Sequence, residues 1–432
     1  MLGEAIAAHR AAQLDVAEAL YRKALQRQAG QPDALHFLGV LCHQRNRSEE
    51  GIRLIRMALR TVPLHADAHN NLGNIHKECG QLAEAEACYR SALACQAQHH
   101  DALSNLALVL DVQGRLEEAL DAYTRLVTQT PQLGRAHYLL GMFRFRHIRE
   151  MEDLEQAVEC FRNAVRHDDA DVRAREELGV ALYMLGRSEE SIGVYRDWLA
   201  REPDNPVPRH MLAACGGQAP PPQAEEAYVR RVFDSFAASF DEQLLKNLDY
   251  RAPQVMVAAL TPRLDAPQGA LDVLDAGCGT GLCGPLIRPY ARRLVGVDLS
   301  AGMLEKASLR GDYDELVEAE LTTWLQASSS AWDIVVCADT LVYFGELLPV
   351  LSATHAALRP GGWLAFTLEV LDGEDDRVEL SASGRYRHSR ACLERILAAA
   401  GFQESTIEEA SLRKELGKQV AGWVVLARKG GE

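Results

Sequence analysis

A glycine-rich segment in the second half of the chain has the residue types needed to hold a nucleoside. The apolar run 273–276 passes into Gly277, Gly279 and Gly281, which predicts a strand that ends in a loop opening a helix. Because glycine lacks a Cβ, such a loop lets the backbone approach a ligand closely. A second apolar run ends at Asp298, whose carboxylate can accept hydrogen bonds from both hydroxyls of a ribose. The pair indicates a nucleoside-containing cofactor on a doubly wound sheet.

The same loop also fits a nicotinamide cofactor. Gly279, Gly281 and Gly284 satisfy the G-x-G-x-x-G pattern, and Asp298 follows about 20 residues later. A nicotinamide-dependent oxidoreductase is therefore one alternative.

Three further features favour S-adenosyl-L-methionine (SAM) over a dinucleotide. Asp275, two residues before Gly277, can hold the amino group of a methionine moiety, and Pro285 stands in the helix entrance. A Pro-Gly-Gly turn follows within residues 358–363. A pyrophosphate would instead require an uncluttered helix N-terminus.

Four segments in order resemble the motifs of class I SAM-dependent methyltransferases: VLDAGCGTG, VGVDLS, WDIVVCADTLVYF and LRPGG. The resemblance runs over residues 233–428. It implies that Asp298 binds ribose, that Leu299 lies beside the adenine and that Met303 packs on its ring. Glu320 stands where the family usually has Asp to accept from the adenine amino group. The expected cofactor-binding residues are Asp275, Gly277, Cys278, Gly279, Gly281, Asp298, Leu299, Met303, Glu320, Leu321 and Asp339.

Residues 233–241 resemble the N-terminal lid that closes over the cofactor in small-molecule methyltransferases. Phe233, Phe236 and Phe240 are spaced by three and four residues, so an ordinary amphipathic helix is equally consistent with the segment.

Methyl transfer from a sulfonium is a direct displacement, so the protein mainly aligns the acceptor, and a general base helps only if the acceptor arrives protonated. The candidate catalytic residues are His388 and Tyr343, although a lone His is more often a capping or surface residue. The candidate substrate-binding residues are Arg385, Tyr386 and Arg387, since Arg can pair with an acidic substrate.

The first half of the chain repeats itself every 34 residues. Leu-Gly or Leu-Ala pairs recur at Leu38, Leu72, Leu106 and Leu140, and the next follows at Leu178 after a longer interval. Thirty-four is the period of the tetratricopeptide repeat, and the resemblance covers residues 1–212. A large apolar residue that plugs the gap between neighbouring helices follows each of these pairs. These residues are Ile55, Tyr89, Tyr123, Phe161 and Tyr195. About six helical hairpins are expected, rather than a generic helical bundle.

A solenoid of this kind offers a concave trough for a protein or peptide partner. Asn71 and Asn105 occupy the same place in consecutive repeats, on the helix expected to face the trough. They are candidate peptide-binding residues, and solvated polar filler is the competing interpretation.

Glycine and proline residues in 216–224 separate two sequence patterns. The expected domains are a repeat α-solenoid over 1–215, a linker over 216–224 and a Rossmann-like α/β methyltransferase domain over 225–432. Strand and helix alternation predicts a mainly parallel sheet covered on both faces. The strands are expected at 270–275, 293–297, 316–319, 333–338, 363–369, 406–410 and 423–428.

The composition of the chain limits which partners and which cellular compartment are expected. The net charge of -15 argues against nucleic acid, because phosphate binding needs clustered Lys and Arg. No apolar segment is long enough to span a bilayer, so no membrane partner is expected. The ten cysteines lack C-x-x-C spacing, which favours neither a metal site nor disulfides and makes a reducing cytoplasm the default location.

The combination resembles the bacterial methyltransferases that contain tetratricopeptide repeats. The expected function is methyl transfer from SAM to a small-molecule or protein-borne acceptor, with the repeats recruiting a substrate or partner protein. A scaffold that binds SAM without transferring the methyl group is the alternative from another class.

Overall fold

The computed structural model describes residues 1–170, 172–237, 240–242, 244, 248–415 and 418–431. The chain divides into two compact units, Met1–Arg175 and Glu176–Glu432, which are described separately. This division by packing falls upstream of the glycine and proline linker at which the sequence changes character. Most of helix α11 (Val172–Met184) and all of helices α12 (Ser188–Arg201) and α13 (Pro206–Ala214) therefore belong to the second unit.

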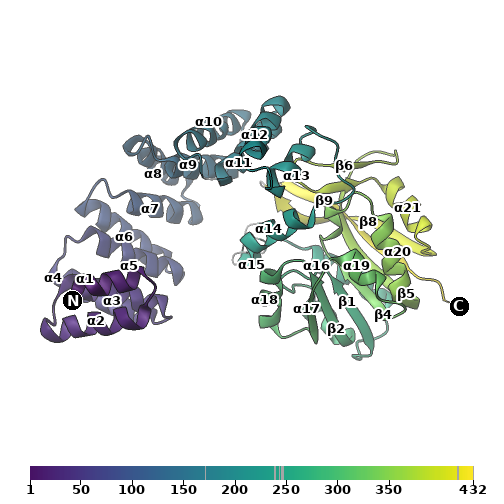
Figure 1. The fold of residues 1–432 in the computed structure, drawn as a ribbon, viewed down its shortest axis with the longest axis horizontal. Helices are drawn as coiled ribbons and strands as arrows, with labels where there is room; N and C mark the ends of the chain where they lie inside the picture. The colour runs from purple at the N-terminus through teal and green to yellow at the C-terminus, as the bar shows by residue number, and fades with distance from the viewer. Residues whose placement is uncertain (171, 238–239, 243, 245–247, 416–417, 432) are drawn as a thin grey trace. The chain divides into compact units, whose positions relative to one another are not determined.

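The helical region consists of successive antiparallel pairs (Figure 1). Its helices are α1 (Leu2–Arg10), α2 (Leu14–Arg27), α3 (Pro32–Gln44), α4 (Ser48–Thr61), α5 (Ala66–Glu78), α6 (Leu82–Cys95), α7 (His100–Val112), α8 (Leu116–Gln129), α9 (Gly134–Arg146), α10 (Met151–His167), α11 (Val172–Met184), α12 (Ser188–Arg201) and α13 (Pro206–Ala214). The expected helical repeat is confirmed, and the wider interval before Leu178 corresponds to the longer helix α10.

Close contact between small and large side chains holds each pair together. A Cβ added at Gly73 on α5 would lie 2.6 Å from Cε1 of Tyr89 on α6, so only a glycine admits the ring there. The plug residues expected from the sequence, Tyr89 among them, are fully buried.

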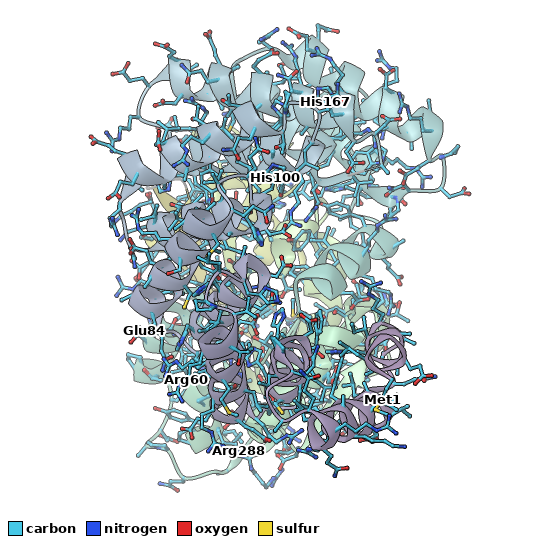
Figure 2. The ribbon with its side chains drawn as sticks, turned by 90° about the vertical axis from the view of Figure 1, so that its left-hand side faces the viewer. Met1, Arg60, Glu84, His100, His167 and Arg288 are labelled. Atoms are coloured by element: carbon cyan, nitrogen blue, oxygen red, sulfur yellow. The ribbon has the colours of Figure 1, made fainter. Side chains whose placement is uncertain are left out.

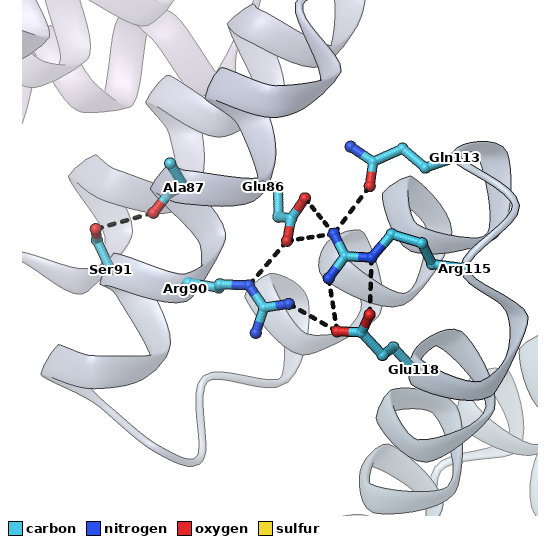
Figure 3. Close-up of polar contacts among 7 residues, drawn as sticks. All are labelled: Glu86, Ala87, Arg90, Ser91, Gln113, Arg115 and Glu118. Carbon is cyan, nitrogen blue, oxygen red and sulfur yellow. Dashed lines mark hydrogen bonds and ion pairs between the residues drawn. The ribbon is translucent and has the colours of Figure 1, made fainter.

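Ion pairs link helices of neighbouring repeats on the exposed side (Figure 3). Arg115, which precedes α8, donates to Glu86 on α6 at 2.7 Å and to Glu118 on α8 at 2.6 Å. Arg90 contacts the same two carboxylates. Two repeats earlier, Arg47 contacts Glu18 and Glu50 in the same way.

Away from these clusters, charged side chains of α4 and α6 extend into solvent. Arg60 on α4 and Glu84 on α6 are both exposed, as Figure 2 shows.

In the described part of the second unit, nine strands form one sheet with the order β3-β2-β1-β4-β5-β7-β6. Strands β1 to β5 run parallel, while β9 pairs antiparallel with both β5 and β8. The strands are β1 (Leu271–Ala276), β2 (Ala291–Asp298), β3 (Glu315–Glu318), β4 (Trp332–Cys337), β5 (Leu358–Val370), β6 (Val378–Leu380), β7 (Tyr386–His388), β8 (Glu404–Glu415) and β9 (Lys418–Arg428). The mainly parallel Rossmann-like sheet is confirmed, and the hairpin of β6 and β7 is an addition to the expected strands.

Helices cover both faces of this sheet (Figure 1). Successive residues of β1 point to opposite faces. Val273 joins a core with α16 (Ala252–Leu260) and α17 (Gly284–Ile287), while Leu274 joins a core with α19 (Leu321–Gln326), α20 (Leu348–Ala357) and α21 (Arg390–Ala399). The remaining helices are α14 (Glu226–Phe236), α15 (Phe240–Glu242) and α18 (Ala301–Arg310). Among the described residues, no helix is both long and apolar enough to cross a bilayer.

Candidate functional site

A pocket opens at the carboxyl ends of the parallel strands in the second unit. Its empty volume is about 1200 Å³, including the part open to solvent. Open α/β sheets bind ligands at this edge. The residues after β1, β2, β3 and β4 line it: Gly277, Cys278, Gly279 and Thr280; Asp298 and Leu299; Ala319, Glu320 and Leu321; Ala338, Asp339, Thr340, Tyr343 and Phe344.

Two glycines of the loop serve different purposes. Gly277 has φ +76°, and a Cβ there would lie 2.1 Å from Oγ1 of Thr340, so the loop packs tightly against the segment after β4. Gly279 has φ +54° and nothing within 4 Å of the position of a Cβ. Gly279 therefore leaves open space beside the backbone, as a ligand requires.

Asp298 ends β2 and lines the pocket. Its Oδ2 accepts from the amide of Gly279 at 2.8 Å, and its Oδ1 accepts from the amide of Ser300 at 2.9 Å. Burial raises the pKa of Asp298 above its usual value, although these amides oppose the shift. Each oxygen keeps a further lone pair, so the carboxylate can still accept from two ribose hydroxyls.

Asp275 is fully buried on β1 and does not line the pocket. The Tyr313 hydroxyl donates to its Oδ2 at 2.5 Å, while its Oδ1 has no hydrogen-bond partner. Burial, together with the charge of Asp298, raises the pKa of Asp275 to about 7. A buried acceptor without a partner carries a desolvation cost that a cationic ligand group would relieve.

Glu320 caps the N-terminus of α19. Its two oxygens accept from the amides of Thr322 at 3.0 Å and Thr323 at 2.7 Å. Burial raises the pKa of Glu320, but these hydrogen bonds outweigh it and hold the pKa below its usual value. Glu320 and Leu321 both line the pocket.

The other expected cofactor residues divide between the pocket and the core behind it. Cys278 and Leu299 line the pocket. Gly281 packs against Tyr313, since a Cβ there would lie 3.0 Å from the ring, and Met303 is buried in α18. Gly281 and Met303 are not among the lining residues.

Aromatic side chains line another part of the pocket. The ring of Phe233 lies 5.9 Å from that of Phe240 and 5.6 Å from that of Tyr343, and Tyr250 lies in the same wall. Of the expected lid, Ala238 and Ser239 lie outside the described residues, as does the side chain of Phe236.

A charged cluster joins the ends of β4, β5 and β8. Asp339, with φ +52°, exchanges hydrogen bonds with Thr367 on β5 and accepts from Arg413 on β8 at 3.1 Å. Arg413 also contacts Glu369, which pairs with Arg385 at 3.4 Å. Asp339, Arg385 and Arg413 all line the pocket, and sequence reasoning missed Arg413.

The structure separates the expected acceptor residues. Arg385 and Tyr343 line the pocket, whereas Tyr386, Arg387 and His388 do not. Burial lowers the pKa of His388 to about 4, and its Nε2 lies 3.2 Å from the carbonyl oxygen of Gly345. His388 is fully buried at this position.

The segment expected to be a linker forms part of the pocket wall. Gln223 and Ala224 line the pocket, and Gln223 makes a β-bridge with Phe344. The amide of Ala224 donates to the carbonyl of Tyr343 at 2.8 Å, and the amide of Glu346 donates to the carbonyl of Pro222 at 2.7 Å. Nothing local in the sequence indicated this partner.

In the repeat unit, both candidate peptide-binding amides contact neighbouring repeats. Asn71 Nδ2 lies 2.9 Å from Nε2 of His36. Asn105 donates to Asn70 at 3.1 Å and to Asn74 at 3.0 Å. Their hydrogen bonds therefore serve packing between repeats.

The fold and pocket define a Rossmann-like cofactor-binding domain that follows a helical-repeat region. Comparison with known families agrees: residues 2–66, 71–134 and 144–206 match the tetratricopeptide repeat, and residues 274–364 match the methyltransferase domain. The chain carries tetratricopeptide repeats and a class I methyltransferase domain, the type of domain that takes SAM as its methyl donor.

Similar curated proteins are methyltransferases. Methyltransferase-like protein 27 of Homo sapiens is 34% identical over 159 residues, which are 34% of this chain and 64% of that protein. Trans-aconitate 2-methyltransferase of Paracidovorax citrulli is 34% identical over 101 residues, 23% of this chain and 39% of that protein. Ubiquinone biosynthesis O-methyltransferase of Thiobacillus denitrificans is 32% identical over 109 residues, 24% and 46% respectively. The chain spans less than two thirds of each relative's length.

Proposed function

We propose that this protein is a SAM-dependent methyltransferase. The observation that carries the proposal is the pocket at the strand ends, in which the open side of Gly279 and the carboxylate of Asp298 lie together. Asp298 would hold the ribose, Leu299 and Leu321 would contact the adenine, and the unpartnered Oδ1 of Asp275 fits a methionine amino group. When bound, SAM supplies an electrophilic methyl group.

The protein's own contribution to the reaction is binding and alignment of an acceptor. Phe233, Phe240, Tyr250 and Tyr343 form an aromatic wall that offers an acceptor an apolar surface, and Arg385 provides a cationic group in the same pocket. We assign Tyr343 and Arg385 to acceptor contact. An acceptor that arrives deprotonated needs no general base.

We propose further that the repeats bind a protein partner or a protein-borne acceptor. The stacked helix pairs of the repeat region offer an extended surface suited to peptides. The ten free thiols fit a reducing compartment, which supports a cytoplasmic location.

Two measurements on the full chain test the proposal. Titration calorimetry should give a micromolar dissociation constant for SAM, about -8 kcal/mol, and no binding of NAD. Incubation with methyl-labelled SAM and an extract of the source cells should transfer label to an acceptor. A scaffold would bind SAM and leave all label on the cofactor, and binding of NAD in place of SAM would favour an oxidoreductase.

A further inference from the structure

Helix α13 is buried almost all round, unlike the earlier helices of the repeat region. Eight of its residues are buried, among them both prolines and His210. One side packs on α12, and Ala213 and Ala214 form a core with Leu380 and Tyr386 from the β6–β7 hairpin. The last helix of the repeats is thus part of the second unit.

A histidine on α13 forms a hydrogen bond to the turn of this hairpin. Nε2 of His210 lies 2.8 Å from the carbonyl oxygen of Gly384, and its ring stacks on Tyr228 of α14 with centroids 3.9 Å apart. A carbonyl only accepts, so Nε2 carries the proton and donates. Gly384 has φ +76°, and a Cβ there would lie 2.6 Å from the Tyr228 hydroxyl, so the contact requires glycine.

A second contact holds the other side of the same turn. The hydroxyl of Tyr386 donates to the carbonyl of Pro221 at 2.5 Å. Between Gly384 and Tyr386 stands Arg385, which lines the pocket. Both neighbours of Arg385 are therefore held by residues from the end of the repeat region and the segment after it.

The same segment fixes Tyr343. Ala224 donates to the carbonyl of Tyr343, and Gln223 pairs with Phe344. The backbone beside both residues assigned to acceptor contact, Arg385 and Tyr343, is thus held by α13 and residues 221–224.

We propose that α13 and residues 221–224 position Arg385 and Tyr343 at the acceptor end of the pocket, with His210 as the principal positioning residue. The acceptor site of the methyltransferase domain is then completed by the last part of the repeat region. The inference rests on the proposed function for the roles of Arg385 and Tyr343, while the anchoring itself is independent of it.

The test compares the full-length protein with His210→Phe, which keeps a ring against Tyr228 and removes the donor to Gly384. Hydrogen exchange of residues 381–388 should become about tenfold faster, the change expected from loss of one buried hydrogen bond. The amides of Ser381 and Gly384 report directly, because they close the turn. His210→Gln, whose amide can donate in place of Nε2, should restore slow exchange. His355→Phe is the matched control and should leave exchange in this segment unchanged.

The rate of methyl transfer is measured for the same variants with labelled SAM and a dilution series of cell extract. His210→Phe should raise the extract concentration for half-saturation at least fivefold, with the plateau rate and the SAM dissociation constant within twofold of the wild type. Tyr386→Phe, which removes the second anchor with little change in volume, should shift half-saturation in the same direction.

Unchanged exchange in His210→Phe overturns the proposal, as does faster exchange without a shift in half-saturation. If the wild-type protein neither binds SAM nor transfers label, the proposed function fails, and the exchange measurement still decides whether α13 anchors the turn.

Discussion

The backbone amide of Gly279 donates to Oδ2 of Asp298 at 2.8 Å, so the carboxylate at the end of β2 holds the glycine loop that follows β1. One side chain therefore shapes the loop and faces the pocket.

Replacing Asp298 by Ala should weaken SAM binding about 10- to 100-fold, because the ribose loses a charged acceptor and the loop loses its anchor. Titration calorimetry measures the change. Glu315→Gln is the control, because Glu315 begins β3 and does not line the pocket. Its SAM dissociation constant should stay within twofold of the wild type. Equal affinity of Asp298→Ala and the wild type would remove Asp298 from the cofactor site.

Asp275→Asn should stabilise the ligand-free protein, and more so at pH 8 than at pH 5.5. The folded pKa of about 7 lies above the usual 3.8 because of burial, so the folded state binds the extra proton between these values. The wild type therefore loses stability as pH rises toward 7, by a few kcal/mol at most, whereas Asn stays neutral. Thermal unfolding at both pH values checks this. A benefit that is larger at pH 5.5 would contradict the assignment, and SAM affinity should fall in the variant.

Acid should destabilise the repeat unit through His36. Burial, with the nearby charge of His65, lowers the folded pKa of His36 to about 4, below the usual 6.5. The unfolded chain then binds the proton first, so stability is lost as pH falls from about 6.5 toward 4, at up to about 1.4 kcal/mol per pH unit. Urea unfolding at pH 7, 6 and 5 should show a shallower pH dependence in His36→Phe. Identical slopes would exclude His36 as a source of the acid sensitivity.

Two glycine substitutions in the helical region should have opposite signs. Gly73→Ala drives a methyl group against the ring of Tyr89 and should destabilise by about 1–3 kcal/mol. Gly193 lies in α12 with nothing within 4 Å of the position of a Cβ, so Gly193→Ala should stabilise by about 0.5–1 kcal/mol. Chemical denaturation of both variants decides. A stabilising Gly73→Ala would mean that the two helices can separate without cost.

Two truncated chains should distinguish the contribution of the repeats to SAM binding from that of the pocket wall. A chain beginning at residue 168 keeps α11 onward and should bind SAM within twofold of the full-length affinity. A chain beginning at residue 225 lacks Gln223 and Ala224, which line the pocket, and should bind several-fold more weakly. Calorimetry on both chains is the measurement, with circular dichroism to confirm folding. Equal affinities would show that the wall does not contribute to cofactor binding.

Sequence reasoning succeeded where a local pattern carries the structure. The 34-residue period follows from the regular recurrence of Leu-Gly and Leu-Ala pairs, and the glycine loop and the strand ending at Asp298 follow from motifs a few residues long. All three appear in the fold. The β6 and β7 strands have three residues each, too few to show an alternating pattern.

Long-range contacts account for what the sequence could not indicate. His388 is buried because β7 pairs with β5 inside the sheet. Arg413 pairs with Asp339, which follows β4, and with Glu369 on β5, while residues 221–224 pair with a segment after β4. Each contact joins residues that are far apart along the chain, so no local motif records it.

The ion pairs of Arg47 and Arg115 lie two repeats apart. Each joins its repeat to the one before, through Glu18 and Glu86. At the junction between them, the equivalent positions hold Gln81 and Ile52, which cannot form an ion pair. Over the first four repeats, equivalent ion-pair junctions are therefore separated by two repeats. Deletion of the repeat formed by α5 and α6 would therefore set Arg115 beside Ile52 and remove its ion pair with Glu86.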